Sequence, residues 1–542
     1  MLPKKDINYD YIIVGAGSAG CVLANRLSEN TENKVLLIEA GGKDTKMEIH
    51  IPAAYSKLNR SAVDWAFYSE PQKNVLNRKL FQPRGKVLGG SSSTNAMAYI
   101  RGNAEDYNDW ASMGCDGWSF EDVLPYFIKS EHNEDYEKLD KRFHGKNGLL
   151  NVRSAYSHHA VSESFIKACM ELGMPLNPDF NGESQEGVNF FQFTVKNHKR
   201  HSTATAFLKP IQKRPNLDIL TNAHVGKILI DEHEACGIEI ISKGNSYKIY
   251  CEKEVILSAG AFGSPQLLML SGIGDATFLK KQGIEVKKDL IGVGKNLQDH
   301  CFAMVSSSSK VPTANHDLKI HNQIKGVLEY FLFKKGVATA SPLEANAFMR
   351  LDSQTDRPDM QFHFVPAHLG GYDVDMYNLN KYPTHSGYTI LATLLRPESR
   401  GYVSIQSKNP LDAPIIQPNY LDTEKDQKTL IQGVKKAFEV MQTNAFDKFR
   451  KEIYFPKNIE NEKDILEHIC KTLECVYHPV GTCKMGTEND EMSVVNSHLQ
   501  VKGIKRLRVV DASIMPQITT GNTNAPVIMI AEKAADMILK TK

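Results

Sequence analysis

Three glycines near the N-terminus constrain the fold of this chain more than any other feature. Gly15, Gly17 and Gly20 follow an apolar, β-branched run over Tyr9–Val14 and precede a stripe of small and apolar residues over 18–28. The first glycine permits a tight turn, the second lets a phosphate approach the backbone, and the third allows close packing of a helix on a strand. The pattern predicts a strand, a phosphate-binding turn and a helix whose N-terminus attracts anions.

A second strand and an acidic residue complete this unit. Residues 35–40 form another apolar run, and Glu39 lies about 20 residues after Gly20, where a carboxylate can accept hydrogen bonds from ribose hydroxyls. The unit predicts dinucleotide binding but does not separate FAD from NAD. A glycine- and serine-rich stretch over 84–95 offers backbone donors to a further part of an extended cofactor, although its composition also suits a flexible linker.

The composition limits the other functions open to the chain. Its 542 residues carry 65 basic and 63 acidic side chains, a formal net charge of +2, which argues against a broad nucleic-acid surface. The nine cysteines include no C-x-x-C pair, so we expect reduced thiols in a cytoplasmic protein. We expect no signal peptide, and no apolar run reaches the roughly 18–20 residues of a spanning helix. Any membrane contact would therefore be peripheral.

The remaining chain predicts two modules with interleaved connectivity. A second strand–helix joint is expected over 255–274, with Ser264 as the helix N-cap, Pro265 in the first turn and Gly272 as the stop. The character then changes to longer strands bounded by proline and glycine. The further predicted elements are strands within 358–366, 387–397 and 401–407, a strand within 506–516 and an amphipathic helix over 525–540.

Five segments resemble the signature sequences of the glucose–methanol–choline (GMC) oxidoreductases. They are residues 85–108, 260–274, 292–300, 477–486 and 507–526, so the likeness covers essentially the whole chain. It is greatest to the bacterial FAD-dependent alkanol dehydrogenases and the choline dehydrogenase-like members.

The resemblance implies an α/β fold, α+β overall, with two modules. A Rossmann-type FAD-binding module over 8–298 would be completed by 500–542. The substrate module over 299–499 would be built on a large, mostly antiparallel sheet flanked by helices, and would carry the catalytic histidine loop.

The same resemblance implies FAD as the cofactor and assigns residues to it. The glycine turn and Glu39 would hold the ADP half, Trp65 would lie near the adenosine, and the backbone of Val225 would meet the adenine. Thr94 stands where some members bind FAD covalently through a histidine, so we expect non-covalent FAD. The predicted cofactor residues are Gly15, Gly17, Ser18, Ala19, Gly20, Glu39, Ala40, Trp65, Arg84, Leu88, Gly89, Gly90, Asn95, Ala96, Met97, Ala98, Val225, Ala259, Asp511, Ala512 and Thr523.

The resemblance also places His478 at the flavin, with Asn522 as its partner. Release of hydride from an alcohol carbon requires help with the hydroxyl proton. A neutral imidazole, whose ordinary pKa is about 6.5, can take that proton at pH 7. Asn522 can donate a hydrogen bond to the developing alkoxide. Pro479 and Gly481 favour a loop at this position.

A metal site is the main alternative for this part of the chain. His468, Cys470, Cys475, His478 and Cys483 invite a zinc site or a Cys–His nucleophile. Their spacings differ from those of structural zinc sites, and Cys470 and Cys475 fall on a predicted helix over 465–476, where cysteine usually packs as a small apolar residue. We therefore predict no metal.

Glu344 leaves the substrate open. By the resemblance it aligns with an acidic position of relatives that include choline dehydrogenases, where a carboxylate could face a quaternary ammonium group. The same position is acidic in relatives that act on neutral alcohols, and a buried structural carboxylate is an equal alternative.

These features predict FAD-dependent oxidation of a primary alcohol, aliphatic or aromatic, to an aldehyde. The expected partners are the alcohol and a quinone or other electron acceptor, with at most peripheral contact at the inner face of the cytoplasmic membrane. A choline dehydrogenase, or an oxidase that uses O₂, are the alternatives within the family. A light-driven decarboxylase or a structural nucleotide-binding protein would not need both His478 and Asn522.

Overall fold

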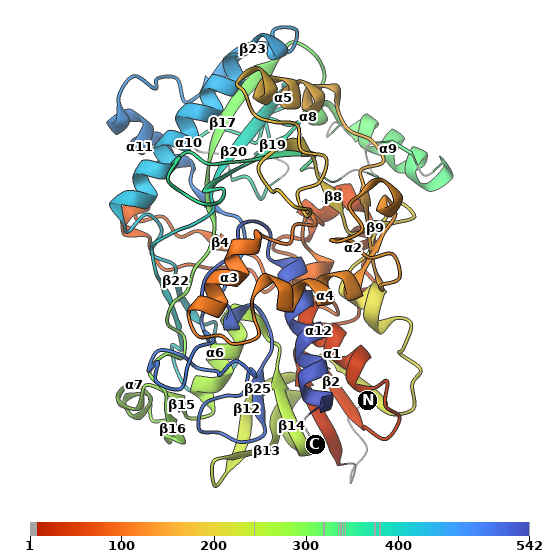
Figure 1. The fold of residues 1–542 in the computed structure, drawn as a ribbon, viewed down its shortest axis with the longest axis vertical. Coiled ribbons are helices and arrows are strands. Elements are labelled where there is room, and N and C mark those ends of the chain that lie inside the picture. The colour runs from red at the N-terminus through yellow and green to blue at the C-terminus, as the bar shows by residue number, and fades with distance from the viewer. Residues whose placement is uncertain are drawn as a thin grey trace.

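Two large sheets occupy opposite ends of the long axis of the molecule (Figure 1). The computed structural model describes residues 8–540 except 243, 318, 319, 334, 337, 338, 340, 342, 373, 374, 379 and 380. Within these residues, no helix combines the length and the apolar character needed to cross a bilayer. The chain passes between the two sheets several times, which confirms the predicted α/β class with interleaved modules.

The first sheet grows from the N-terminal unit. It contains β1 (Tyr9–Val14), β2 (Val35–Glu39), β11 (Leu217–Thr221), β12 (His224–Asp231), β13 (Glu234–Ser242), β14 (Asn245–Leu257) and β25 (Leu507–Val509). The strand order is β11-β2-β1-β14-β13-β12, with β25 beside β14. The pairs from β11 to β14, and β14 with β25, are parallel, whereas β12, β13 and β14 are antiparallel. All of β2 and all of β1 except Asp10 are buried, as expected for parallel strands covered on both faces.

Two helices that are distant in sequence cover this sheet together. Helix α1 (Ser18–Leu27) follows the glycine turn, and α12 (Asn524–Lys540) packs against it (Figure 1). Arg26 of α1 donates to both carboxylate oxygens of Glu532 of α12, at 2.8 and 2.7 Å. The C-terminal helix therefore completes the N-terminal strand–helix–strand unit.

The second sheet is antiparallel throughout. It contains β7 (Gly187–Phe190), β17 (Cys301–Ser309), β18 (Ala345–Met349), β19 (Met360–Val365), β20 (Gly387–Leu394), β23 (Arg450–Phe455) and β24 (Glu474–Cys475). The order is β23-β17-β20-β19-β18-β7, with β24 beside β17. Helices α10 (Glu424–Gln442) and α11 (Glu462–Thr472) contact this sheet. On α10, Leu430, Val434, Ala437 and Met441 are buried, which is the spacing of one helix face.

The helix of the second strand–helix joint begins earlier than predicted. Helix α6 (Gly260–Leu270) already contains Ser264 and Pro265, so the prediction of Ser264 as its N-cap is wrong. The Ser264 hydroxyl instead donates to the Asp511 carboxylate at 2.6 Å, a contact that local sequence cannot show. Gly272 follows the helix with φ of +85°, as a helix stop requires.

Two other expectations need correction. Within 401–407 only β21 (Tyr402–Ser404) is a strand, and it pairs with β22 (Ile415–Gln417) outside both large sheets. Cys475 lies on β24 and not on helix α11, because that helix ends at Thr472 with Leu473 in an extended conformation. Strand β24 then pairs with β17 through Cys475 and Cys301.

The remaining elements lie outside the two large sheets. The helices are α2 (Met47–His50), α3 (Ala104–Ser112), α4 (Phe120–Ser130), α5 (Ala160–Glu171), α7 (Ala276–Lys281), α8 (Ala314–Asp317) and α9 (Ile320–Phe333). The strands are β3 (Phe67–Tyr68), β4 (Phe81–Gln82), β5 (Glu131–Asn133), β6 (Leu150–Ser154), β8 (Gln192–Phe193), β9 (Val195–Lys196), β10 (Lys199–Arg200), β15 (Ile273–Gly274) and β16 (Lys288–Asp289).

Candidate active site

A cavity of about 1290 Å³ extends from the glycine turn of the first sheet to strands β19 and β20 of the second. Typical small-molecule sites occupy about 300–1,000 Å³, so this cavity has room for a large cofactor and a substrate together. Both predicted catalytic residues line it. So do most of the predicted cofactor residues, namely Gly15, Gly17, Ser18, Ala19, Glu39, Ala40, Trp65, Arg84, Gly90, Asn95, Ala96, Met97, Ala98, Val225, Ala259, Asp511, Ala512 and Thr523.

The other three predicted cofactor residues lie behind the cavity wall. A Cβ atom on Gly20 would come within 1.9 Å of the Gly15 carbonyl oxygen, so Gly20 serves the predicted close packing of helix on strand. The Gly89 N–H donates to the Ala16 carbonyl at 2.7 Å, which joins the two glycine-rich loops. Leu88 packs against the apolar core of the first sheet. These three residues shape the cavity without facing it.

The glycine turn has the free backbone donors that a pyrophosphate needs. Gly15 has φ of +99°, and a Cβ atom there would lie 2.5 Å from the Ser258 carbonyl oxygen. No side chain caps helix α1 at Gly17, so its first N–H groups face the cavity at the positive end of the helix dipole. The buried Ser258 hydroxyl, which also lines the cavity, has no partner in the described part of the chain. These features fit the diphosphate of FAD.

Glu39 is buried where a ribose would lie. One of its oxygens accepts from the Ala16 N–H at 3.0 Å and the other from the Gly41 N–H at 2.8 Å. Burial raises the pKa of Glu39 to about 7, against the lowering effect of these two donors. Each oxygen keeps a further lone pair, so the carboxylate can still accept from ribose hydroxyls. Trp65, stacked on Phe67 with ring centroids 5.6 Å apart, lines the same cavity.

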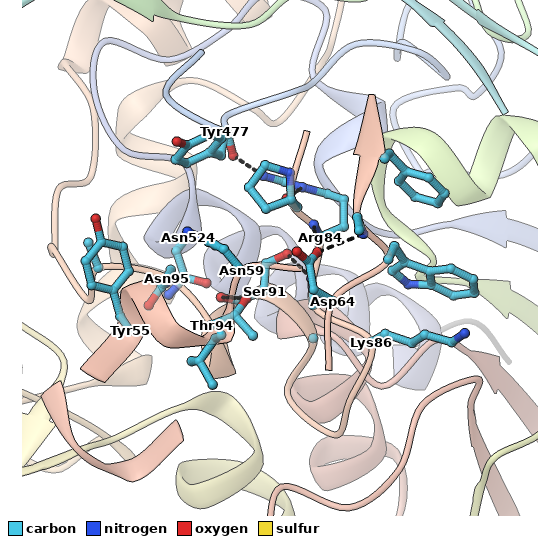
Figure 2. A pocket seen from close by; sticks show the side chains of 18 of the residues that line it. Tyr55, Asn59, Asp64, Arg84, Lys86, Ser91, Thr94, Asn95, Tyr477 and Asn524 are labelled. Carbon is cyan, nitrogen blue, oxygen red and sulfur yellow. Dashed lines mark hydrogen bonds between the residues drawn. The ribbon is translucent and has the colours of Figure 1, made fainter. Parts of the chain in front are cut away.

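The loop that carries Asn95 is held from outside the cavity by a buried arginine. Arg200 donates to the Asn95 side-chain oxygen at 2.7 Å and to the Ser92 carbonyl at 3.2 Å. Thr94 lines the cavity and its hydroxyl lies 3.5 Å from the Ser91 carbonyl oxygen. Figure 2 shows Thr94 and Asn95 together on this wall. A threonine hydroxyl cannot replace the imidazole of a covalent flavin link, which agrees with non-covalent FAD.

His478 and Asn522 lie in direct contact, and the hydrogen bonds fix the imidazole tautomer. The His300 Nε2 lies 2.9 Å from the Leu395 carbonyl oxygen, which can only accept, so this nitrogen carries the proton. The His300 Nδ1 is then an acceptor, and the His478 Nδ1 at 3.0 Å must donate to it. The His478 Nε2 therefore carries a lone pair, which accepts from the Asn522 amide at 3.1 Å.

The electrostatic surroundings keep His478 neutral. Burial lowers its pKa well below 6.5, and the neighbouring His300, His363 and Arg84 lower it further. At pH 7 the Nε2 is therefore unprotonated, and its lone pair can take a proton when a substrate hydroxyl replaces the Asn522 amide hydrogen bond. The Asn522 side-chain oxygen is buried without a partner among the described residues, so it can accept from a ligand.

The loop before His478 is strained and held from two sides. Tyr477 has φ of +69°, which is unfavourable for a residue with a side chain. Arg84 donates to the Tyr477 carbonyl at 2.5 Å (Figure 2), and the His478 N–H donates to Asp299 at 2.7 Å. Tyr420 donates to the other Asp299 oxygen at 2.6 Å. Arg84 thus faces the cavity but also positions the histidine loop, a role that the sequence did not indicate.

Hydrogen bonds to Asp106, at the start of helix α3, hold the loop before Asn522. The Thr520 N–H and hydroxyl donate to the two Asp106 oxygens at 2.6 and 2.7 Å. Gln185 donates to the Thr520 carbonyl at 2.6 Å. Gly521 has φ of +130°, and a Cβ atom on it would lie 2.6 Å from Ile100. Asn522 is therefore presented to His478 by contacts that leave its backbone little freedom.

Comparisons with known proteins agree with this geometry. The sequence matches the GMC oxidoreductase family over residues 9–302 and 397–531. The chain belongs to the GMC oxidoreductases. It is 44% identical over 538 residues to an alcohol dehydrogenase (acceptor) of Pseudomonas putida, which covers 98% of this chain and 96% of the relative. It is 41% identical over 540 residues to the mitochondrial choline dehydrogenase of Mus musculus, with 98% and 89% covered.

Solved structures of this GMC oxidoreductase's relatives share its whole fold. Pyridoxine 4-oxidase from Mesorbium loti superposes with a TM-score of 0.88 at 30% identity, over 98% of this chain and 99% of that one. An Aspergillus oryzae formate oxidase superposes with a TM-score of 0.91 at 27% identity, over 98% of each chain. These findings confirm the predicted family and fold class. They also confirm FAD as the cofactor and the oxidation of a small-molecule alcohol as the reaction class.

Several residues that shape the site of this GMC oxidoreductase were not predicted. Asp299 and His300 lie in the signature segment 292–300, so a signal existed for them, but it indicated no role. Asp106 lies in the signature segment 85–108, which likewise indicated no role for it, and Arg200 lies in none of the five segments; the partners of both are far away in the sequence. His363 of β19 also lines the cavity, with its Nδ1 3.0 Å from the Thr393 hydroxyl.

The residues that suggested zinc do not converge. The His468 Nε2 contacts the Met304 carbonyl at 2.7 Å, and the Cys470 and Cys475 thiols donate to separate backbone carbonyls at 3.2 Å each. Among the described residues, no group of three or more His, Cys, Asp and Glu side chains is arranged to hold a metal ion. The prediction that Cys470 lies on a helix holds, since α11 contains it.

Glu344 lies on the cavity wall and also caps a helix. One of its oxygens accepts from the His159 N–H at 2.8 Å and from the Ser162 hydroxyl at 2.6 Å, at the start of α5. Burial raises the pKa of this carboxyl group. The structural role left open by the sequence is therefore present, and the position on the cavity wall leaves contact with a substrate open as well.

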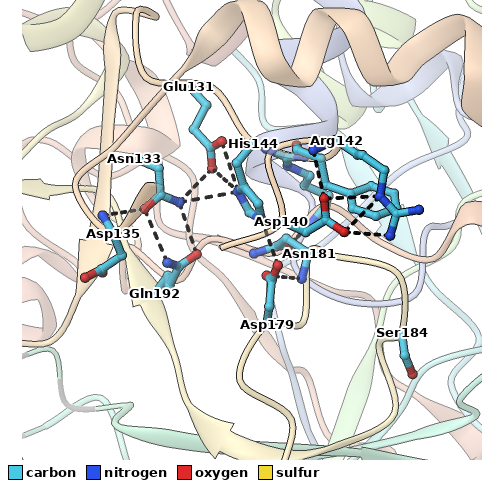
Figure 3. Close-up of polar contacts among 12 residues, drawn as sticks. Glu131, Asn133, Asp135, Asp140, Arg142, His144, Asp179, Asn181, Ser184 and Gln192 are labelled. Atoms are coloured by element: carbon cyan, nitrogen blue, oxygen red, sulfur yellow. Dashed lines mark hydrogen bonds and ion pairs between the residues drawn. The ribbon is translucent and has the colours of Figure 1, made fainter. Parts of the chain in front are cut away.

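A second buried histidine lies outside the cavity and has the opposite surroundings (Figure 3). The His144 Nδ1 lies 3.1 Å from a Glu131 oxygen, and its Nε2 lies 2.8 Å from an Asp179 oxygen. Arg101 also donates to Glu131, at 2.8 Å. The hydrogen bonds to the two carboxylates raise the pKa of His144 against the effect of burial. This cluster joins the segment after α4 to the loop around Asp179.

Proposed function

We propose that this GMC oxidoreductase oxidises primary alcohols, aliphatic or aromatic, to aldehydes, and that His478 accepts the hydroxyl proton. The observation that carries the proposal is the unprotonated Nε2 of His478, which faces the cavity beside the Asn522 amide. A substrate hydroxyl placed against both groups would find an acceptor for its proton and a donor for its oxygen.

The proposed mechanism assigns one step to each group of the pair. As the hydroxyl proton moves to the His478 Nε2, the Asn522 amide donates to the alkoxide oxygen that develops. Bound FAD supplies the acceptor for the hydride that leaves the alcohol carbon. His478 keeps its Nδ1 proton throughout, because His300 accepts a hydrogen bond from it. Since both residues are buried or nearly so, little water competes for the oxygen.

We also assign the predicted cofactor residues to FAD by their places around the cavity. The turn at Gly15 to Ala19 would bind the diphosphate, and Glu39 the ribose. Trp65 and Val225 would border the adenine, and the segment from Asn95 to Ala98 the flavin. With this assignment, the FAD-binding module runs over 8–298 and 500–542, and the substrate module over 299–499.

Choline oxidation is the second candidate, and Glu344 is the observation that favours it. A carboxylate on the cavity wall could face a quaternary ammonium group, and one relative is a choline dehydrogenase. We favour neutral alcohols because Glu344 already accepts hydrogen bonds at the start of α5. Burial also raises the pKa of its carboxyl group, which disfavours the charged form that would attract a cation.

The electron acceptor that we propose is a quinone, reached by peripheral contact of a cytoplasmic protein with its membrane. Support comes from the relative described as acting with an acceptor. An oxidase would instead return the electrons to O₂.

Anaerobic reduction of the purified holoenzyme tests the substrate. Addition of 1-alkanols or benzyl alcohol should bleach the visible absorbance of the flavin, and choline should do so more slowly. Faster bleaching by choline, lost in Glu344→Gln, would select the second candidate. Turnover in air equal to turnover with a soluble quinone would select the oxidase.

A further inference from the structure

Several described apolar side chains of helix α9 are turned outward. Asn322, Gln323 and Gly326 line the cavity, whereas Leu328, Phe331 and Leu332 are 54%, 47% and 69% exposed. At 3.6 residues per turn, these two sets lie on different faces of the helix. A surface helix of a globular protein normally shows the reverse arrangement, with its apolar face inward. A contiguous exposed apolar set of this kind indicates an interaction surface.

Exposed lysines lie on the segments next to helix α9. Phe333 ends the helix at 66% exposure, and Lys335 beyond it is exposed. The hairpin of β9 and β10 adds Lys196 and Lys199, both exposed. We call the exposed apolar residues of α9 and these three lysines the α9 surface.

The hairpin and the helix are physically joined. The Tyr330 hydroxyl of α9 donates to the His198 carbonyl, at the turn between β9 and β10, at 3.1 Å. Figure 1 shows α9 projecting from the body of the molecule at the level of the second sheet. Tyr330 is only 2% exposed, so this bond holds the hairpin and its two lysines against the inward side of α9.

We propose that the α9 surface docks on an anionic lipid bilayer. Large apolar side chains beside lysines are the composition of interfacial membrane-binding helices, in which apolar insertion adds to attraction by anionic headgroups. The acidic Glu329 on the same helix lies beside Gly336 on the cavity side. A symmetric dimer through the α9 surface would bring the three lysines of each copy into one interface, where their like charges are unfavourable.

This docking would bring the cavity to the membrane. Because α9 contributes residues to the cavity wall, an apolar alcohol or quinone dissolved in the bilayer would lie close to the site. The inference rests on the proposed function, since it names the source from which that site draws its apolar substrates. Short, water-soluble alcohols should not depend on it.

Vesicle sedimentation of the holoenzyme tests the docking. Vesicles of phosphatidylcholine with one part in three of phosphatidylglycerol should bind the wild type, and phosphatidylcholine alone should bind it much more weakly. The double substitution Leu332→Ser with Phe333→Ser should weaken binding by about tenfold or more. Lys196→Glu with Lys199→Glu should weaken binding to the anionic vesicles by a similar factor. Tyr250→Ser, at a 52% exposed side chain of β14, should change nothing.

Three outcomes would overturn the docking. One is wild-type protein that stays in the supernatant with both vesicle types, and another is binding by both double variants that equals wild-type binding. The third is a wild-type dimer in sedimentation velocity that the Leu332 and Phe333 substitutions dissociate, because a second copy would then cover the surface. Flavin bleaching by a short-chain alcohol without vesicles is the independent reading of the proposed function. The rate of this bleaching should be equal in all variants. If the proposed function is wrong, the flavin will not bleach, whereas if only the docking is wrong, bleaching will remain and vesicle binding will be absent.

Discussion

His478 and His144 are both buried, but their surroundings drive their protonation in opposite directions. Burial lowers the pKa of His478 well below 6.5, and the neighbouring His300, His363 and Arg84 lower it further. Around His144 lie Glu131 and Asp179, and its pKa rises. Burial alone would lower both values. For His478 the neighbours act in the same direction as burial, whereas for His144 the two carboxylates reverse it.

The two sites also differ in how the ring nitrogens are used. Both nitrogens of His144 face carboxylate oxygens, so the protonated ring donates twice and has no free lone pair. His478 donates once, to another neutral imidazole, and keeps a lone pair on the cavity side. A histidine beside another imidazole can therefore act as a base, whereas a histidine between two carboxylates acts as a structural cation.

Removal of the base should give the largest effect. In His478→Ala, FAD should remain bound, because the glycine turn and Glu39 are unchanged. A positioned general base contributes about 10²–10⁴ in rate, so flavin reduction in stopped flow should slow by that factor. A variant that reduced its flavin at nearly the wild-type rate, with FAD fully bound, would show that another group takes the proton.

Removal of the structural histidine should instead lower stability. His144→Ala would leave the buried Glu131 and the half-buried Asp179 without their shared partner, and breaking a buried charge network typically costs about 3–5 kcal/mol. The free energy of unfolding should fall by that order in urea denaturation, with flavin reduction unchanged under native conditions. The exposed His498→Ala is the matched control. A loss no larger than that of the control would contradict the contrast drawn here.

Loss of the partner of His478 should have an effect of intermediate size. Asn522→Ala keeps the base but removes one donor to the developing alkoxide, so flavin reduction should slow by about 10²–10³ at most. Combined with His478→Ala, the effects should be less than additive, because both groups act on one oxygen. Fully additive losses would place the two residues in separate steps.

A residue that only positions Asn522 should matter less. Asp106→Asn keeps the size of the side chain but weakens its hold on the Thr520 N–H and hydroxyl. Misplacement of Asn522 should lower kcat by roughly tenfold and leave KM within a factor of two. The solvent isotope effect on flavin reduction should also rise, since proton transfer becomes less well aligned. A change in KM alone would indicate a role in substrate binding instead.

The smallest effect concerns pH. Because the pKa of His478 is lowered, flavin reduction should be nearly constant from about pH 6.5 upwards and should fall only in more acidic solution. The free energy of unfolding should also depend on pH. His300 and His363 have pKa values of about 4 and about 3 in the folded protein, so their contribution is complete above the pKa of histidine in the unfolded chain. That contribution is lost as the pH falls below that value. For His144 the sign is opposite, and its contribution is lost as pH rises through its raised pKa. A rate that rose steadily between pH 7 and 9 would contradict the assignment.

The sequence predicted the parts of this site that depend on local pattern. The strands over Tyr9–Val14 and Val35–Glu39 follow from apolar runs that end at glycine, and the structure confirms both. The motif resemblance also brought His478 and Asn522 to one cavity, where the structure places them in contact.

The parts that escaped prediction depend on contacts between distant residues. Helix α6 begins at Gly260, and the Ser264 hydroxyl that was expected to cap it bonds instead to Asp511, 247 residues away. The tautomer of His478 is fixed by His300 and Leu395, and the grip on Asn522 comes from Asp106, 414 residues from Thr520. No local pattern records such pairs, because each forms only when distant segments of the chain pack together.

The position of β25 and α12 has a consequence for biosynthesis. Strand β25 pairs with β14 and helix α12 packs on α1, yet both emerge from the ribosome about 500 residues after the glycine turn. A nascent chain that has already made β1, α1 and β2 must keep their apolar faces protected until those late segments arrive. We therefore expect chaperones to act on this protein during translation, and FAD to be captured only after synthesis is complete.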